Sequence, residues 1–167
     1  FNHLGVNKDA GWFKSHPISE LSENLTNAGY TFDYISDKKL LNCKTINGGI
    51  VTSGSAGYKS IIIPKTEYIP LETLKMLAGF IAEGGKVYFD EYLPKSVPGM
   101  YELEKRVLEL DKIKAELSTK NCLGDVVDLL TQNDVLGEKS LVENGIHFLK
   151  MTMNDEDWYM VFNTGTK

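Results

Sequence analysis

The sequence predicts an α/β fold, in which a small, mainly parallel sheet carries helices on its faces and an antiparallel hairpin follows at the end. Two apolar runs, KSIIIP at 59–64 and KVYFDE at 86–91, have the composition of strands in a parallel sheet. The residues between them have helical leucine spacing, and a strand–helix–strand unit with short links pairs its strands in parallel. Two further β-prone runs, 146–153 and 158–165, surround the polar residues NDED and predict the hairpin.

Four elements are expected before the parallel strands. Residues 1–7 are a short apolar start, read as the remnant of a first strand. Residues 17–30 have apolar side chains at helical spacing and end at Gly29, which predicts a helix. Residues 32–36 are β-prone and predict a strand, and residues 36–42 form a helical turn or loop.

A hairpin and a helix come next. Asn47-Gly48 lies between two short β-prone runs and predicts a tight hairpin, because both turn positions require a positive φ. Residues 54–58 (GSAGY) are expected to be a flexible link. Pro70 suits a first helical turn and Gly84-Gly85 a helix end, and the helix between them has a core-facing stripe of Leu71, Leu74, Leu77, Ala78 and Ile81.

Two more helices are predicted before the final hairpin. Residues 100–118 form a long helix with a polar outer face, and residues 124–135 form a second helix with Asp125 near its start, where a carboxylate favours the helix dipole. The long helix is expected to turn inward Leu103, Val107, Leu110, Ile113 and Leu117.

Size and composition limit the classes of function. The chain has 167 residues and 42% hydrophobic residues, which fits one domain with a real core. The net charge of -5 gives no basic footprint for nucleic acid, and the apolar runs are too short to span a membrane. Cys43 and Cys122 lack metal-ligand spacing and are predicted to be free structural thiols. Because the chain begins with Phe1, it is expected to be a piece of a longer protein.

Acidic and aromatic residues follow the two parallel strands. Glu67 comes shortly after the first strand, and Asp90, Glu91 and Tyr92 come at the end of the second. Ligands of open parallel sheets bind beyond the carboxyl ends of the strands, so we expect these four residues to share one rim. A glycosidase needs two carboxylates, one as acid and one as base or nucleophile. The rim is therefore a catalytic pair, an accessory contact or solvated surface, with the last two favoured over catalysis.

Several enzyme classes lack their required parts. No Cys follows KVYFDE, which excludes the nucleophile of a class I glutamine amidotransferase, and residues 7–16 lack the hydroxyl-rich phosphate loop of a flavodoxin. The scattered histidines His3, His16 and His147 give no metal-ligand spacing. We therefore predict no cofactor and no metal site.

Two groups of residues could bind a ligand, although each group also has a simpler structural explanation. Residues 154–157 could supply oxygen ligands to calcium, although a polar hairpin tip explains them as well. Four large aromatic residues could stack on sugar rings, although such residues usually fill cores or interfaces; they are Trp12, Phe13, Trp158 and Tyr159.

Three ordered motifs carry a family resemblance. The first has Gly29, Tyr30, Phe32, Asp33 and Tyr34; the second has Tyr58, Pro64, Pro70, Glu72, Thr73, Leu74, Gly84 and Gly85; the third has Tyr159, Val161 and Asn163. In this order, from about residue 27 to 164, they resemble a region of large bacterial α-L-rhamnosidases of glycoside hydrolase family 106. One departure is Lys150-Met151, which stands where that family tends to have His-Arg.

The resemblance implies a particular fold and setting. Such enzymes place their acid and base on a (β/α)8 barrel, and the matching region is similar to the amidotransferase-like domain after the barrel and to the trimerisation domain of some β-galactosidases. This implies a three-layer, flavodoxin-like or class I glutamine amidotransferase-like α/β fold. It also implies a bacterial periplasmic or extracellular location, with no catalytic residue of the family on this chain.

The leading hypothesis is therefore that residues 1–167 form a single, non-catalytic accessory domain of a multidomain glycoside hydrolase acting on plant or bacterial polysaccharide. Its expected partners are the catalytic barrel of the same polypeptide, carbohydrate and a second copy of the chain, but neither nucleic acid nor membrane. A free-standing carbohydrate-binding module is the alternative. A small enzyme that uses Glu67, Asp90 and Glu91 is the third hypothesis.

Overall fold

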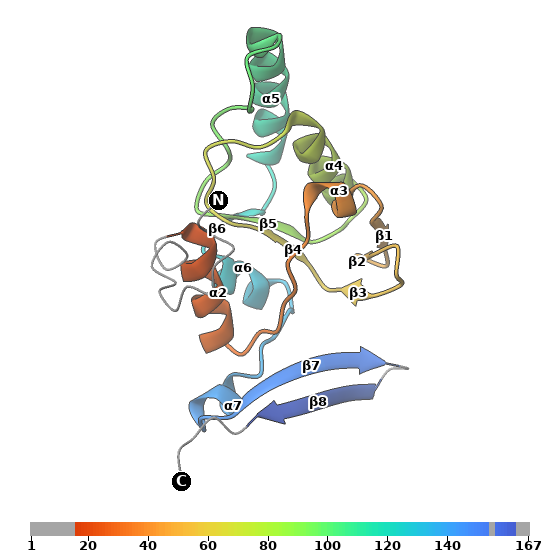
Figure 1. Cartoon of the computed structure of the whole chain (residues 1–167), viewed down its shortest axis with the longest axis vertical. Helices are drawn as coiled ribbons and strands as arrows, with labels where there is room; N and C mark the ends of the chain where they lie inside the picture. Colours follow the sequence, from red (N-terminus) through yellow and green to blue (C-terminus); the bar gives the residue numbers. More distant parts are fainter. Residues whose placement is uncertain (1–15, 154–155, 163–167) are drawn as a thin grey trace, which may run out of the picture. The chain divides into compact units, whose positions relative to one another are not determined.

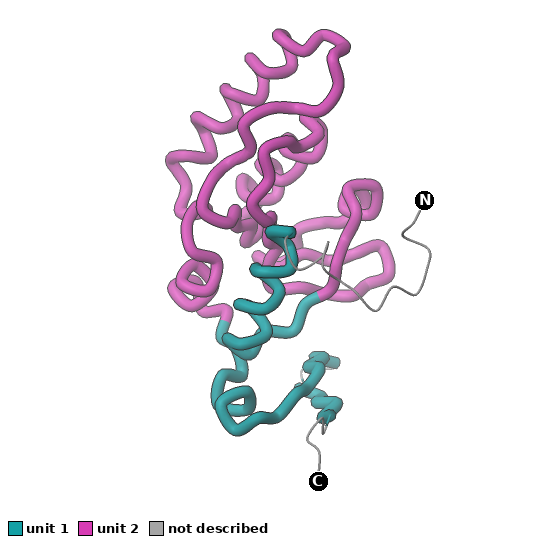
Figure 2. Tube along the Cα trace, turned by 60° about the vertical axis from the view of Figure 1, so that its left-hand side comes forward, with its two compact units in different colours: residues 1–32, 136–167 teal, residues 33–135 magenta. Residues whose placement is uncertain are grey.

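The computed structural model describes residues 16–153 and 156–162, and the chain divides into two compact units (Figures 1 and 2). Unit 1 contains Phe1–Phe32 and Leu136–Lys167, and unit 2 contains Asp33–Val135. The expected first strand at residues 1–7 lies outside the described residues.

Unit 2 contains the predicted parallel sheet. Strand β4 (Ile61–Ile63) pairs in parallel with β5 (Val87–Asp90), with Ile61 opposite Val87 and Ile63 opposite Phe89. The two-residue strand β6 (Leu123–Gly124) pairs in parallel with the other edge of β5, giving the order β4-β5-β6. The predicted mixed α/β class with a parallel sheet is confirmed.

Helices lie on both faces of this sheet, as Figure 1 shows. Helix α4 (Leu71–Ala82) and helix α5 (Leu103–Leu117) share one core with β5, in which Leu74, Leu77 and Leu110 are fully buried. Val87 and Phe89 of β5 belong to that core, whereas the buried Tyr88 alternates to the opposite face of the strand. Helix α6 (Val126–Gln132) also contacts β5.

The helix ends follow the predicted signals. Pro70 lies at the N-cap of α4, one position before the predicted first turn, and Gly84 follows α4 with a φ of 85°. Asp125 caps α6, because its side chain accepts a hydrogen bond from the backbone N–H of Asp128 at 3.0 Å.

The predicted Asn47-Gly48 hairpin is confirmed. Both turn residues have positive φ, 51° and 77°, and they join strands β1 (Lys44–Ile46) and β2 (Gly49–Val51). A short helix, α3 (Asp37–Leu40), precedes the hairpin, as expected for that segment. The link expected to be flexible instead contributes β3 (Gly57–Tyr58), which adds a third antiparallel strand beside β2.

The predicted strand at residues 32–36 is wrong. The segment runs without regular secondary structure, and Tyr34 and Ile35 are exposed. Within unit 2, the Tyr58 hydroxyl donates a hydrogen bond to Asp33 Oδ2 in this segment at 2.7 Å. β-Prone residues form a strand where a pleated face is buried, and these side chains lack that burial.

Unit 1 joins two distant parts of the sequence. Helix α2 (Pro17–Asn27) is confirmed and ends before Gly29, which has a φ of 83°. The Glu138 backbone N–H donates to the Gly29 carbonyl at 2.8 Å, and a Cβ atom on Gly137 would overlap the Ala28 carbonyl. This close approach of two backbones requires glycine at position 137.

The predicted C-terminal hairpin is also confirmed in unit 1. Strands β7 (His147–Met153) and β8 (Glu156–Phe162) pair in antiparallel fashion along their full length. They follow α7 (Lys139–Glu143), a short helix that the sequence pattern did not predict.

The core of unit 2 gives the first prediction. Leu74 has 0% exposure, whereas Leu108 on the outer face of α5 is 65% exposed. We expect Leu74→Ala to lower the free energy of unfolding by about 2–5 kcal/mol, because it leaves a cavity in a packed core. Leu108→Ala is the matched control and should change it by less than about 0.5 kcal/mol. Urea unfolding followed by circular dichroism measures both, and equal effects would show that the core is placed wrongly.

Candidate functional site

The loops after β4 and β5 are joined to each other by backbone contacts. The carbonyl of Glu67 accepts hydrogen bonds from the backbone N–H groups of Lys95 and Ser96 at 2.9 and 3.0 Å. The Ile69 N–H donates to the Ser96 carbonyl at 3.1 Å, and Tyr68 and Ser96 form a parallel bridge. Glu67 and the loop after Tyr92 therefore lie side by side at the carboxyl ends of the strands.

Both glutamates of this rim are held by lysines. Glu67 Oε1 lies 2.7 Å from Lys95 Nζ, and Glu91 Oε1 lies 2.7 Å from Lys65 Nζ. The hydrogen bond to Glu67 is the main cause that raises the pKa of Lys95, and the nearby Tyr92 and Tyr68 add to it. Because the glutamate side chains are more than half exposed, these are surface ion pairs, which contribute little to stability and fix side-chain positions.

The end of β5 is sharply turned. Glu91 has a φ of 62°, its N–H donates to the Gly124 carbonyl at 3.0 Å, and the Tyr92 N–H donates to the Asp90 carbonyl at 2.8 Å. A non-glycine residue in the left-handed region is strained, and such positions gather at functional sites. Asp90 is half-buried and Glu91 exposed, so the two neighbouring acids stand in different environments.

The rim also presents two aromatic rings to solvent. Tyr68 is 59% exposed and Tyr92 37% exposed. With the two lysine–glutamate pairs they form a polar and aromatic surface, which we call the rim: Lys65, Glu67, Tyr68, Asp90, Glu91, Tyr92 and Lys95. Aromatic faces and charged hydrogen-bonding groups suit contact with a sugar or with another protein surface.

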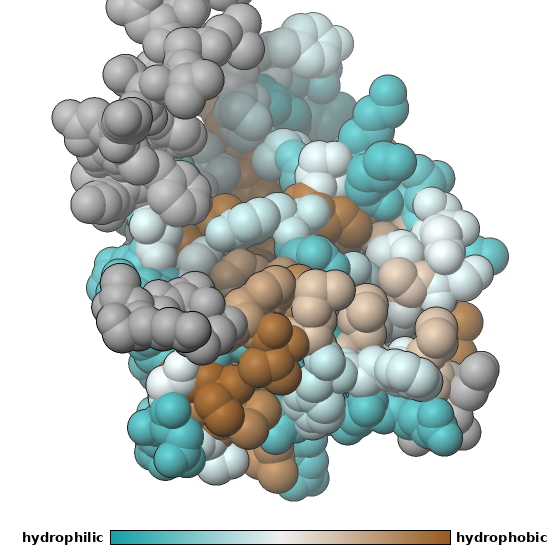
Figure 3. All heavy atoms as spheres, turned by 60° about the horizontal axis from the view of Figure 1, so that its bottom comes forward, coloured by the Kyte–Doolittle hydropathy of each residue, from teal (hydrophilic) through white to brown (hydrophobic). Residues whose placement is uncertain are grey.

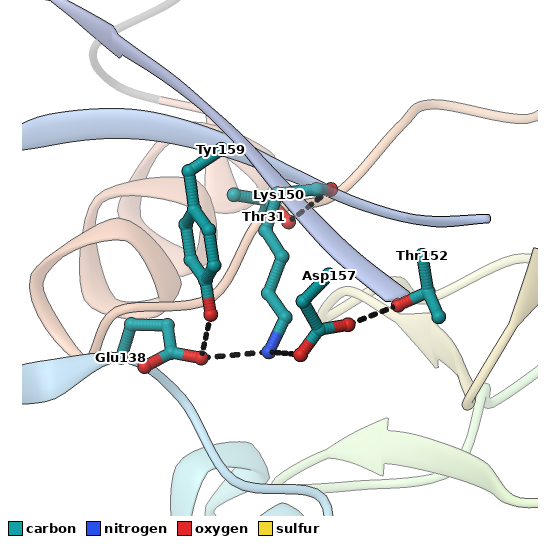
Figure 4. A network of polar contacts seen from close by, with 6 residues as sticks. All are labelled: Thr31, Glu138, Lys150, Thr152, Asp157 and Tyr159. Carbon is teal, nitrogen blue, oxygen red and sulfur yellow. Dashed lines mark hydrogen bonds and ion pairs between the residues drawn. The ribbon is translucent and has the colours of Figure 1, made fainter. Parts of the chain in front are cut away.

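A second polar cluster lies in unit 1 and was not predicted (Figure 4). Lys150 on β7 places its Nζ atom 2.7 Å from Glu138 Oε1 and 2.7 Å from Asp157 Oδ2 on β8. The Tyr159 hydroxyl donates to Glu138 Oε1 at 2.7 Å, and the Thr152 hydroxyl donates to Asp157 Oδ1 at 2.7 Å. The cluster therefore ties one face of the hairpin to the residue that precedes α7.

The electrostatics of this cluster favour fixed charges. Hydrogen bonds to Asp157 and then to Glu138 raise the pKa of Lys150 far above its usual range, so its ammonium stays charged. Hydrogen bonds from Lys150 and Tyr159 lower the pKa of Glu138. The contacts of this ammonium with two carboxylates link β7 and β8 to Glu138.

Lys150 belongs to the Lys150-Met151 pair, which stands where the motif resemblance leads us to expect His-Arg. Its side chain is mostly buried, and its carbonyl accepts a hydrogen bond from the Thr31 hydroxyl at 3.4 Å. Polar residues at every second position of the two strands indicate that the hairpin has one polar face; these are positions 150, 152, 157 and 159. Nothing in the sequence indicated that Glu138 would complete it.

The remaining candidates that fall within the described residues do not gather into a site. His16 caps α2 through Nδ1 and His147 begins β7, while His3, Trp12 and Phe13 lie outside the described residues. Of the calcium candidates, Asn154 and Asp155 are also outside them, and Asp157 binds Lys150. In the part of the chain that the structure describes, no three His, Cys, Asp or Glu side chains form a metal-ligand group.

Cys43 and Cys122 are free and buried, as predicted, and burial raises the pKa of both thiols. Across residues 16–153 and 156–162, no helix has the length and hydropathy needed to cross a bilayer.

Comparison with known proteins shows a distant and partial similarity to a larger protein. The chain is 24% identical over 148 residues to a protein named "Putative beta-glucuronidase" from Formosa agariphila. The match covers 86% of this chain but 13% of that protein. No family model and no solved structure matches the chain. The chain therefore resembles a small part of a larger protein named as a glycoside hydrolase, which confirms the predicted likeness at that level.

The pKa of Glu138 gives the second prediction. This pKa is lowered in the folded state, so the ionised Glu138 carboxylate stabilises the fold. The stabilisation is fully present above the ordinary glutamate pKa of about 4.3, and it is lost as the pH falls through the lower pKa of the folded state. We expect the amide hydrogen-exchange protection of β7 and β8 to decline across that acidic window. Glu138→Gln should lower the protection already at neutral pH and flatten its pH dependence.

Glu143→Gln is the matched control for that prediction. Glu143 is exposed and pairs with Lys139 at 3.8 Å, outside the cluster. The Glu143→Gln substitution should leave unchanged both the hydrogen-exchange protection of the hairpin and the pH dependence of that protection. If the hydrogen-exchange protection of the unmodified chain did not change with pH across this range, Glu138 would have no stabilising role.

Proposed function

We propose that this chain is a non-catalytic accessory domain of a glycoside hydrolase. The observation that carries the proposal is the match of 86% of the chain to 13% of a protein named as a β-glucuronidase. A segment that fills so small a part of such a protein is one domain among several. The proposal treats residues 1–167, with both compact units, as that domain.

The rim supports a role without catalysis. Glycoside hydrolysis requires one carboxyl that holds a proton and one that is free to attack or to activate water. At the rim, Glu67 and Glu91 are both exposed and both bound to a lysine at 2.7 Å. We therefore assign Glu67, Asp90, Glu91 and Tyr92 to contact with the substrate or with a neighbouring domain, and no catalytic residue to this chain.

The fold agrees with that role. A parallel sheet with helices on both faces, followed by an antiparallel hairpin, suits the flavodoxin-like, amidotransferase-like accessory domain that the motifs resemble. The catalytic carboxylates would lie on a barrel elsewhere in the polypeptide, outside the bacterial cytoplasm. The name of the relative favours a glucuronide as the substrate of the larger protein, whereas the sequence motifs favour a rhamnoside. Both substrates are glycosides and would be cleaved by a glycoside hydrolase.

A free-standing carbohydrate-binding module is the second candidate, and the two exposed tyrosines of the rim favour it. Binding of an acidic polysaccharide by the isolated chain, lost on Tyr68→Ala and Tyr92→Ala, would support this candidate. An accessory domain whose rim faces protein would bind no polysaccharide alone.

The third prediction concerns activity of the isolated 167-residue chain. We expect no hydrolysis of 4-nitrophenyl β-glucuronide or α-L-rhamnoside above a mock preparation, because Glu67 and Glu91 of the rim are each bound to a lysine rather than arranged as an acid–base pair. Release of nitrophenol, read by absorbance, is the measurement. Turnover that disappears in Glu91→Gln would overturn the proposal and make the rim an active site.

The fourth prediction concerns the rim within the full polypeptide that contains this chain. Alanine replacement of Glu91 and Tyr92 should raise KM or weaken domain association while leaving most of kcat, because contact residues bind rather than react. Glu116→Ala, an exposed position on α5, is the matched control and should change neither. A fall in kcat of about a thousandfold with association intact is the size of effect expected of a general acid or base, and would contradict the assignment.

A further inference from the structure

The C-terminal hairpin has two chemically different faces. Cross-strand partners share a face, and one face carries the pairs Phe148–Val161, Lys150–Tyr159 and Thr152–Asp157. We call this the inner face, because Lys150 and Tyr159 bind Glu138 of the same unit. The rings of Phe148 and Tyr159 also lie 5.9 Å apart, and Lys150 Nζ lies 5.4 Å from the Tyr159 ring centre.

The opposite face is apolar and exposed. Its central pairs are Leu149–Met160 and Met151–Trp158, and Phe162 and Met153 extend it towards the two ends. We call it the outer face, and its residues are 40–61% exposed: Leu149, Met151, Met153, Trp158, Met160 and Phe162. Figure 3 shows tan and brown spheres gathered along the hairpin on the side it brings forward.

An exposed apolar face of this kind is expected to be covered by another surface. A two-stranded hairpin alone is at best marginally stable in water, and contiguous apolar patches on soluble proteins mark interaction sites. With seven residues in each strand, the outer face is about 20 Å long. The contacts of the inner face hold the hairpin within unit 1 and leave the outer face available to a partner.

The chemistry of the outer face identifies the kind of partner. Its polar members, His147 and Glu156, pair with Phe162 and Met153 at its two ends, so its centre carries no charge. Leu, Met, Phe and Trp suit the fully buried centre of a protein–protein interface, whereas a sugar ring needs polar groups beside the aromatic face. The face therefore fits an apolar protein surface rather than a polysaccharide.

The matched relative shows where such a surface would come from. The region similar to this chain makes up 13% of that protein, so most of its length lies outside the similarity. We infer that the outer face docks the hairpin onto an apolar surface of a neighbouring domain in the same polypeptide. The inference rests on the proposed function, because it requires that larger protein.

Methionine oxidation tests this in the full polypeptide. Hydrogen peroxide oxidises exposed methionines, and peptide mass spectrometry gives a rate for each residue. We expect Met151, Met153 and Met160 to be oxidised at least tenfold more slowly in the full polypeptide than in the isolated 167-residue chain. Met76, partly buried on α4, should react slowly in both proteins and serves as the internal reference.

Two results would overturn the inference. Equal rates at the three methionines in the full polypeptide and in the isolated chain would mean that no neighbouring domain covers the face. Protection in the isolated chain that grows with protein concentration would mean that a second copy covers it. If the gene encodes no further domain, the proposed function itself fails, which is a separate result from either of these.

A variant pair sharpens the test. Met160→Lys adds a charge to the centre of the outer face, where the side chain is exposed, so the isolated chain should keep its circular dichroism spectrum. In the full polypeptide it should abolish the protection of Met151 and Met153. Leu108→Lys, at a similarly exposed position on α5, should leave that protection unchanged. Persistent protection in Met160→Lys would count against docking through this face.

Discussion

The position of the rim depends on the pairing of β5 with a parallel neighbour on each side. β5 lies in the middle of the order β4-β5-β6, with Val87 and Phe89 in the core formed by α4 and α5, and Tyr88 buried on the other face. A short strand buried on both faces has little freedom to shift, because any shift would expose these large side chains. Asp90 ends this strand, and the Glu91 N–H donates a hydrogen bond to the carbonyl of Gly124, the last residue of β6.

Charge compensation is what favours the proposed contact role of the rim over the catalytic pair that its acids also match in sequence. Two acidic positions after parallel strands match the residue types of a glycosidase. In the structure, Lys65 and Lys95 each bind one of the glutamates, and neither lysine was recognised in the sequence as part of the rim. Paired charges on a fixed surface select partners and set their orientation, which is consistent with the accessory role proposed above.

The sequence predicted elements with strong local signals and missed those that depend on distant partners. The leucine spacing of α4 and the Asn47-Gly48 turn are local, and both are confirmed. Strands β3 and β6 have two residues each, too few for any periodicity, and exist because longer strands lie beside them. The parallel-strand rule brought Glu67 and Tyr92 to one edge, but the cluster around Lys150 needed Glu138, a contact that no local pattern encodes.

The pairing register of β7 and β8 is fixed by the different side chains on the two faces of the hairpin, in addition to the backbone hydrogen bonds. Side chains alternate along a strand, so a slip of β8 by one residue would exchange its inner and outer sets. Trp158 and Met160 would then face Glu138, and Asp157 would leave Lys150 with one carboxylate fewer. Because such a slip loses ion pairs and buries apolar groups beside charge, insertions between β7 and β8 are tolerated only where they leave both strands in place. The two strands cannot shift against each other without the loss of these contacts.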